Sequence, residues 1–277
     1  MTGINPEALA AWQAAIGRTE IRREVLEAES LRRYALAVDA DPAVEAVPPP
    51  LAHWAFFLPQ PRDADIGPDG HMRRGGFIPA ITLPRRMFAA GAMQFEAPLE
   101  LGMAAEQVST IAEVNHKRGR SGDLVFVEID KVLSQGGTVR VRERQSFVYR
   151  DLGDGTPMPV AAEDAPEGEM WEPTAAQLFR FSAVTFNSHR IHYDADYVRD
   201  EEGYPALVVH GPLTAAKLAG LAGRARALRA FAFRAQAPLF LGQAIALQHQ
   251  GGEVQESEVR AVRCDGATAM TASFDYG

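Results

Sequence analysis

Four stretches between residues 94 and 149 constrain the fold of this chain more than any other feature. They combine β-branched side chains with partial two-residue alternation: 94–97 (QFEA), 106–114 (EQVSTIAEV), 124–130 (LVFVEID) and 138–149 (TVRVRERQSFVY). Glycine-containing turns separate the later stretches at 119–122 and 136–137. Such alternation is typical of half-buried strands, and short glycine turns connect antiparallel neighbours. The sequence therefore predicts an antiparallel sheet here.

The first forty residues carry a different pattern and predict helices. Residues 6–16 are amphipathic, and residues 19–37 are rich in charged helix formers. Three consecutive prolines within residues 47–51 end this pattern, because proline cannot lie in a helix interior. Residues 59–84, rich in Pro, Gly and Asp, predict irregular structure.

The second half repeats the combination of a helix with strands. An aperiodic run of Gly, Pro, Asp and Glu over residues 151–171 predicts a linker. Gly211-Pro212 opens a predicted helix over 213–228, since proline suits the first helical position. Strands are predicted at 230–235, 244–250, 256–263 and 268–274. The expected class is α+β, with one half at residues 1–150 and the other at residues 172–277.

Composition restricts the function classes. The chain has 277 residues, 47% of them hydrophobic, and a net charge of -8, so it can bury a core but lacks the basic surplus of a nucleic-acid binder. Cys264 is the only cysteine, which excludes an internal disulfide and a thiolate metal cluster. The N-terminus lacks the pattern of a secretion signal, and no apolar run reaches the roughly 18 residues that cross a bilayer. We expect a cytoplasmic protein without a membrane segment.

Residues 181–194 (FSAVTFNSHRIHYD) and 208–215 (VVHGPLTA) hold the candidate chemistry. Three of the seven histidines, His189, His192 and His210, fall in these two stretches. His192 directly precedes a predicted short helix that Asp194 caps and that ends near Gly203. A histidine at such a position is a reasonable general acid or base. No carboxylate stands at a familiar ligand spacing from the histidines, and the glycine runs match no phosphate loop, so the sequence predicts neither a metal nor a cofactor.

These residues resemble the MaoC-like, or hydratase-2, family. His192 matches the catalytic histidine of that family, and Asn187 stands where the family usually has aspartate. His210-Gly211 matches a later His-Gly before a long helix. The phrase FNSHRIHYD, together with residues 83–91 and 117–127, is similar to a subgroup that includes mesaconyl-C4-CoA hydratases and mitochondrial-type hydroxyacyl-thioester dehydratases.

The resemblance implies a double hotdog, in which antiparallel sheet wraps around a helix in each half. The N-terminal half is then a degenerate hotdog and the C-terminal half the catalytic one. The implied reaction is reversible hydration of an α,β-unsaturated acyl-CoA, most simply a short branched dicarboxylic one of the mesaconyl-C4-CoA type. Itaconyl-CoA hydratase, (3R)-hydroxyacyl-thioester dehydratase, hotdog thioesterase and non-catalytic acyl-CoA binding protein are the alternatives.

The expected catalytic groups are His192 as acid/base, Asn187 as a water-orienting amide, His189 as a helper and the Gly211 N–H as a donor to the enolate oxygen. Expected contacts with CoA phosphates or a substrate carboxylate come from basic side chains and His210. These residues are Arg190, Arg85, Arg86, Lys117, Arg118, Arg120 and His210. The partner is the acyl-CoA itself, and a homodimer is expected by analogy with other hotdog proteins.

Overall fold

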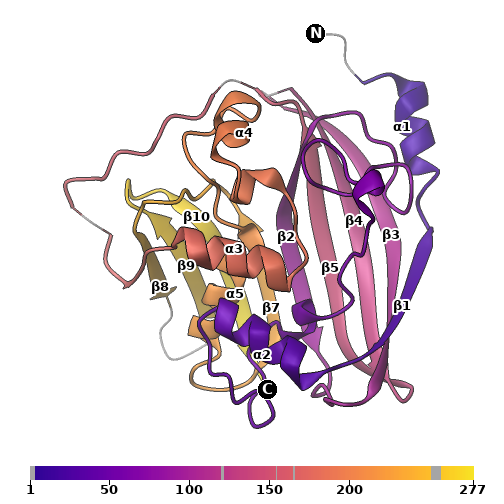
Figure 1. Ribbon diagram of the computed structural model, residues 1–277, viewed down its shortest axis with the longest axis vertical. Helices are drawn as coiled ribbons and strands as arrows, with labels where there is room; N and C mark the ends of the chain where they lie inside the picture. Colours follow the sequence, from indigo (N-terminus) through magenta and orange to yellow (C-terminus); the bar gives the residue numbers. More distant parts are fainter. Residues whose placement is uncertain (1–3, 120–121, 154, 165, 251–256) are drawn as a thin grey trace.

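The computed structural model describes residues 4–119, 122–153, 155–164, 166–250 and 257–277. Within them, ten antiparallel strands form one continuous sheet in the order β1-β3-β4-β5-β2-β7-β10-β9-β8-β6 (Figure 1). The strands are β1 (Thr19–Val25), β2 (Arg85–Phe95), β3 (Ala104–Gly119), β4 (Gly122–Gln135), β5 (Thr138–Arg150), β6 (Glu169–Trp171), β7 (Leu228–Ala235), β8 (Ile245–Gln250), β9 (Ser257–Arg263) and β10 (Thr268–Tyr276).

The helices gather mainly on the side of the C-terminal strands. In Figure 1, α2, α3 and α5 lie in front of β7–β10, whereas α1 lies outside the N-terminal strands next to β3. The helices are α1 (Pro6–Gln13), α2 (Ala28–Ala37), α3 (Ala175–Val184), α4 (Ala195–Asp200) and α5 (Gly211–Ala222), with short 3-10 helices η1 (Ala52–Ala55), η2 (Asp63–Asp65) and η3 (Arg190–His192). The α+β double hotdog expected from the sequence is confirmed.

Strands β2 and β7 join the two halves of the sheet. Gly91 pairs with Phe233 across this junction. A Cβ atom on Gly91 would lie 2.6 Å from the Phe233 ring, so only glycine lets the two strands pair with that ring in place. The junction makes one curved sheet from two five-stranded halves.

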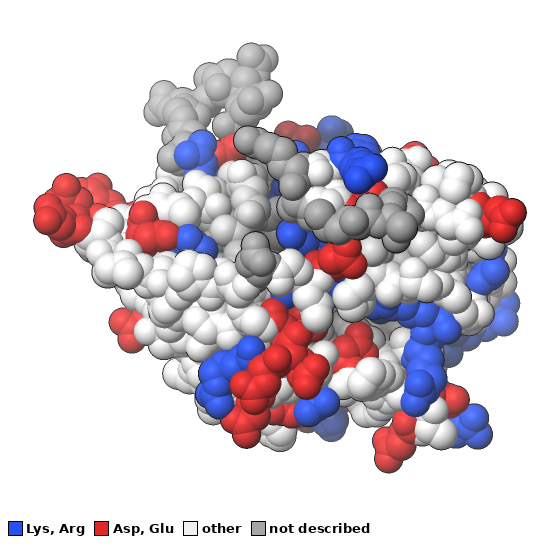
Figure 2. All heavy atoms as spheres, turned by 90° about the horizontal axis from the view of Figure 1, so that it is seen from above, with Lys and Arg blue, Asp and Glu red and all other residues white. Residues whose placement is uncertain are grey.

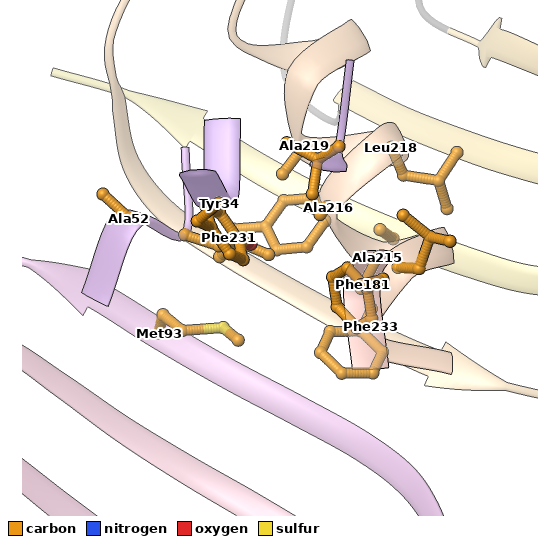
Figure 3. Packing of buried hydrophobic residues seen from close by; sticks show 14 of the residues in the cluster. Tyr34, Ala52, Met93, Phe181, Ala215, Ala216, Leu218, Ala219, Phe231 and Phe233 are labelled. Atoms are coloured by element: carbon orange, nitrogen blue, oxygen red, sulfur yellow. The ribbon is translucent and has the colours of Figure 1, made fainter. Parts of the chain in front are cut away.

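The main core lies between α5 and the C-terminal strands. Figure 3 shows Ala215, Ala216 and Ala219 of α5 among Phe181, Phe231 and Phe233. Small side chains on the buried helix allow the close approach that the aromatic rings need to pack. This packing fixes the start of α5, and with it the residues around Gly211.

Several predicted element bounds are wrong. Residues 19–25 form β1, not a helix, because pairing with β3 (Thr19 opposite Thr110) overrides the helix propensity of their charged side chains. Strand β2 begins at Arg85, well before the predicted residue 94. The helix predicted to reach residue 228 ends at Ala222 with Gly223 as its C-cap.

Two further elements were not predicted. Helix α3 begins at the cap Thr174, whose hydroxyl accepts the Gln177 N–H. Strand β6 occupies the last three residues of the predicted linker and pairs with β8. The division into residues 1–150 and 172–277 stays a prediction. Within the described residues, the helices are all too short or too polar to traverse a bilayer.

Candidate active site

A cleft of about 1080 Å³ runs between the two halves of the molecule. Its lining includes residues of the N-terminal strands, residues of the segment between η2 and β2, and the stretch that precedes α5. His189 and His192 line it, as do Asn187 and Gly211, so the structure brings together the four residues that the sequence singled out for catalysis.

Local turns place Asn187, His189 and His192 between α3 and α4, whereas Gly211 begins α5. Phe186 adopts a left-handed conformation (φ 49°), which reverses the chain after α3. Asp194 then caps α4 as predicted, its Oδ1 accepting the Tyr197 N–H at 3.0 Å. The histidines therefore lie in a loop held at both ends by helices.

His192 is buried, and a single contact fixes its tautomer. Its Nδ1 lies 2.7 Å from the carbonyl oxygen of Val208. Because a carbonyl only accepts, Nδ1 carries the proton and Nε2 carries the lone pair. Burial lowers the pKa of His192 to about 4, an effect that the Val208 contact partly offsets. The ring is therefore neutral at physiological pH and able to accept a proton through Nε2.

His210 lies behind His192 and outside the cleft lining. The two rings stack with centroids 3.6 Å apart, and His210 Nε2 lies 2.8 Å from the Ser182 hydroxyl. The side chain is completely buried. In this structure His210 packs against the His192 ring, and the substrate contact expected of it stays a prediction.

His189 also contacts His192. The two rings meet edge to face, with centroids 5.4 Å apart. Burial, followed by the nearby His71, holds the pKa of His189 well below its usual value. His189 is thus a neutral imidazole in the cleft wall.

Asn187 also holds the catalytic loop. Its Oδ1 accepts the backbone N–H of His189 at 3.1 Å, and only the oxygen end of the amide can do so. One lone pair of the carbonyl oxygen thus fixes the loop, while the second lone pair and the amide nitrogen have no other partner among the described residues. The role of Asn187 in orienting water stays a prediction.

Gly211 begins α5 and presents its N–H where helical N–H groups lack intrahelical partners. No described residue accepts a hydrogen bond from it. The helix dipole favours negative charge at this end, so the Gly211 N–H can stabilise a developing enolate oxygen. One such donor typically stabilises the transition state by about 3 kcal/mol.

Sequence reasoning missed Asp69 and His71. They lie more than a hundred residues before the catalytic loop, yet the His71 and His189 ring centroids are only 3.9 Å apart. Ligand atoms of Asp69, His71 and His189 all lie within 4.8 Å of one another, the one such group found among the described residues. A carboxylate does therefore accompany these histidines, which their spacing in sequence could not reveal. A hydrogen bond already joins two of the three, Asp69 and His71.

The basic candidates divide by what their guanidinium or ammonium groups contact. Arg190 forms a two-pronged ion pair with Asp194 and donates to the Pro68 carbonyl, outside the cleft lining. Arg85 lines the cleft, but its guanidinium is engaged in a buried pair with Glu202. Both guanidinium groups thus have protein carboxylate partners, and the substrate contacts expected of these two arginines stay predictions.

The remaining basic candidates are closer to expectation. Arg86 lines the cleft and lies over the Phe147 ring, and no described carboxylate pairs with it. Lys117 also lines the cleft, above Phe126. Arg118 is exposed outside the lining, so its expected role stays a prediction, and Arg120 lies outside the described residues. The face in Figure 2 carries acidic and basic side chains interspersed.

Comparisons with known proteins show the family of this chain. A family model described as hydroxyacyl-thioester dehydratase type 2 matches residues 51–241. Mesaconyl-C(4)-CoA hydratase of Chloroflexus aurantiacus is 41% identical over 278 residues, covering 97% of this chain and 99% of that protein. The mitochondrial hydroxyacyl-thioester dehydratase type 2 of Schizosaccharomyces pombe is 24% identical over 70% of this chain and 75% of its own length.

Solved structures show the same fold. A MaoC-like dehydratase from Phytophthora capsici superposes with a TM-score of 0.72 at 13% identity, covering 99% of this chain and 98% of that one. A Mycobacterium tuberculosis protein described as a double hotdog matches with a TM-score of 0.55 at 12% identity, over 94% and 95% of the two chains. The chain therefore belongs to the hydroxyacyl-thioester dehydratase type 2 family, a MaoC-like group of hydro-lyases built on the hotdog fold.

Proposed function

We propose that this protein hydrates a short, branched, dicarboxylic α,β-unsaturated acyl-CoA of the mesaconyl-C4-CoA type, giving the citramalyl-type 3-hydroxyacyl thioester. The observation that carries the proposal is the neutral imidazole of His192, whose lone-pair nitrogen shares one cleft with the free N–H of Gly211. Hydration needs both: a base for the water and a donor for the enolate oxygen.

The reaction can be followed through these residues. Water attacks the β-carbon while His192 Nε2 takes one of its protons. The electron pair of the double bond moves onto the thioester oxygen, where the Gly211 N–H donates. The imidazolium then returns its proton to the α-carbon, so one water is added in total and His192 ends neutral.

The cleft wall supports a short polar acyl group. Buried polar side chains on the N-terminal strands line it: Gln107, Ser109, Glu143 and Gln145. A long aliphatic chain laid against them would remove their polar groups from water without offering hydrogen bonds, which is costly. Arg86, with no described carboxylate partner, is the proposed receptor for a substrate carboxylate, and Lys117 a proposed contact for CoA phosphates.

Mesaconyl-C4-CoA, itaconyl-CoA and crotonyl-CoA distinguish the alternatives when offered to the purified protein. The absorbance of the conjugated thioester and the release of free thiol are followed together. We expect loss of absorbance without thiol release, fastest with mesaconyl-C4-CoA. Hydration of crotonyl-CoA alone moves the substrate towards fatty acyl chains. Thiol release identifies a thioesterase, and binding without reaction identifies a non-catalytic acyl-CoA protein; either result contradicts the proposal.

A further inference from the structure

His71, from the N-terminal half, lines the same cleft as His192 and is paired with Asp69, which lies outside the lining. Asp69 Oδ2 lies 3.1 Å from His71 Nδ1, and Asp69 Oδ1 accepts the His71 backbone N–H at 3.0 Å. A carboxylate only accepts, so Nδ1 carries the proton and Nε2 the lone pair. No described residue bonds Nε2. The pair therefore presents an oriented proton acceptor to the cleft.

Backbone contacts hold this pair against the catalytic loop. The Asp69 carbonyl accepts the Arg190 N–H at 2.9 Å, and the Gly70 carbonyl accepts the Ser188 hydroxyl at 2.6 Å. The Pro68 carbonyl accepts from the Arg190 guanidinium at 3.0 Å. The three contacts use carbonyl groups, so they leave the Asp69 carboxylate free to bond His71 and leave the His71 ring in the cleft wall. Arg190 and Ser188 thus position the N-terminal loop.

Position 187 carries an amide, which cannot take up a proton as a carboxylate can. The site therefore needs another group that accepts hydrogen bonds from water. An attacking water needs acceptors for its two O–H groups, and the Asn187 oxygen already spends one of its two lone pairs on the His189 N–H. The ring of His71 lies against His189, which in turn lies against His192. A proton on His71 would be close enough to lower the pKa of His192.

We propose that His71, oriented by Asp69, is a second catalytic imidazole that holds the attacking water together with His192. The assignment rests on the proposed hydratase function. The water donates one O–H to His192 Nε2 and the other to His71 Nε2. The first O–H bond breaks, its proton passing through His192 to the α-carbon. The second stays intact and becomes the product hydroxyl, so His71 acts by orientation and Asp69 is a positioning residue.

Burial supports this role. It lowers the pKa of His71 below its usual value, although the Asp69 contact partly offsets the effect. Burial alone would raise the pKa of Asp69, but the hydrogen bonds from His71 hold it below its usual value. The pair therefore consists of a carboxylate and a neutral imidazole, as an acceptor for water requires.

His71→Ala and Asp69→Asn test the assignment, and the chain offers a matched control. His116 Nε2 lies 2.7 Å from Asp123 Oδ1, another histidine–aspartate pair, and neither residue lines the cleft. We expect His71→Ala to lower kcat for hydration at least about 100-fold with little change in KM, and Asp69→Asn to lower kcat about 10-fold. His116→Ala and Asp123→Asn should stay within about twofold of the wild type. Asp69→Glu, which keeps the carboxylate, should restore part of the kcat.

Three results would overturn the assignment. One is a kcat of His71→Ala close to that of the wild type in a variant whose thermal unfolding is unchanged. Another is an effect confined to KM. The third is loss of wild-type activity on dialysis against a chelator with recovery on adding Zn²⁺, because Asp69, His71 and His189 would then be metal ligands. A wild type that hydrates none of the thioesters contradicts the proposed function itself, whereas a hydrating wild type with an unaffected His71→Ala contradicts only this step.

Discussion

His192 Nδ1 donates to the Val208 carbonyl oxygen at 2.7 Å, and this contact decides which ring nitrogen faces the reaction. Val208 lies just before α5, so the same segment that fixes the tautomer of His192 leads into the N–H of Gly211. The base and the oxyanion donor are therefore held by one short stretch of chain. Their relative position does not depend on side-chain rearrangement when substrate binds.

The acid limb of the pH profile should reflect the buried state of His192. Its pKa is lowered to about 4, and the neutral ring is the active form, so kcat/KM should be level at neutral pH and fall only as pH drops through about 4. Raising the pH above neutrality leaves the His192 ring neutral, so it should not lower kcat/KM through this residue. The measurement is kcat/KM for hydration in brief pH-jump assays, which limit acid unfolding. An acid limb near the ordinary histidine value of about 6.5 would contradict a buried, neutral base.

Gly70→Ala should separate the N-terminal loop from the catalytic loop. Gly70 has φ +85°, and a Cβ atom there would lie 1.9 Å from the Ser188 carbonyl oxygen, so the two loops must move apart. We expect kcat to fall at least about 10-fold, because small misplacements of catalytic groups are costly. Gly17→Ala is the matched control, with φ +84° and open space around the new Cβ. It should cost about 1 to 2 kcal/mol of stability and leave kcat unchanged. Equal kcat values for the two variants would contradict the loop contact.

Arg85→Met should destabilise the fold, because it leaves Glu202 buried without its ion-pair partner. Arg85 Nε lies 3.0 Å from Glu202 Oε2, and both side chains are buried. Breaking such a pair costs about 3 to 5 kcal/mol. The double variant Arg85→Met, Glu202→Gln removes the unpaired charge and should recover part of that loss. Free energies of unfolding from urea titrations measure both. A stable Arg85→Met whose only defect is weaker CoA binding would instead support the ligand-binding role.

Arg86→Met should discriminate between substrate classes. If its guanidinium binds the substrate carboxylate, its removal takes away charge-assisted hydrogen bonds of about 2 kcal/mol, or roughly 30-fold in kcat/KM for the dicarboxylic thioester. Crotonyl-CoA, which lacks that carboxylate, should be affected less than about threefold. Arg229→Met, at an exposed position of β7 outside the cleft lining, is the control and should change neither value. An equal loss on both thioesters would assign Arg86 to the CoA moiety or to catalysis in general.

The sequence predicted the fold class, the strands β3–β5 and the cap of α4, because each depends on local alternation or on a single capping side chain. It failed at residues 19–25, where charged residues with helix propensity form an edge strand through pairing with a segment ninety residues away. Residues 85–93 were missed because β2 is a central strand whose pairing partners, β5 and β7, come from different halves of the chain.

The residues of the site also divide into those that a local motif reveals and those that contacts between distant segments bring in. Asn187, His189 and His192 lie in one short stretch and Gly211 in a second one soon after it, so motifs could bring them together. Asp69 and His71 lie in a segment whose composition predicted only irregular structure, and three backbone contacts to residues 188–190 bring them to the cleft. The sequence also does not show that Arg85 and Arg190 have the carboxylate partners Glu202 and Asp194.

The most direct test of the account is mesaconyl-C4-CoA hydration in ¹⁸O-labelled water by the wild type and by His192→Ala, with the product thioester analysed by mass spectrometry. His116→Ala, outside the cleft, serves as the control. The account predicts that the wild type and His116→Ala form an intact thioester carrying one labelled oxygen, and that His192→Ala loses at least about 100-fold in rate. Undiminished product formation by a folded His192→Ala, or labelled free acid in place of the labelled thioester, would contradict it.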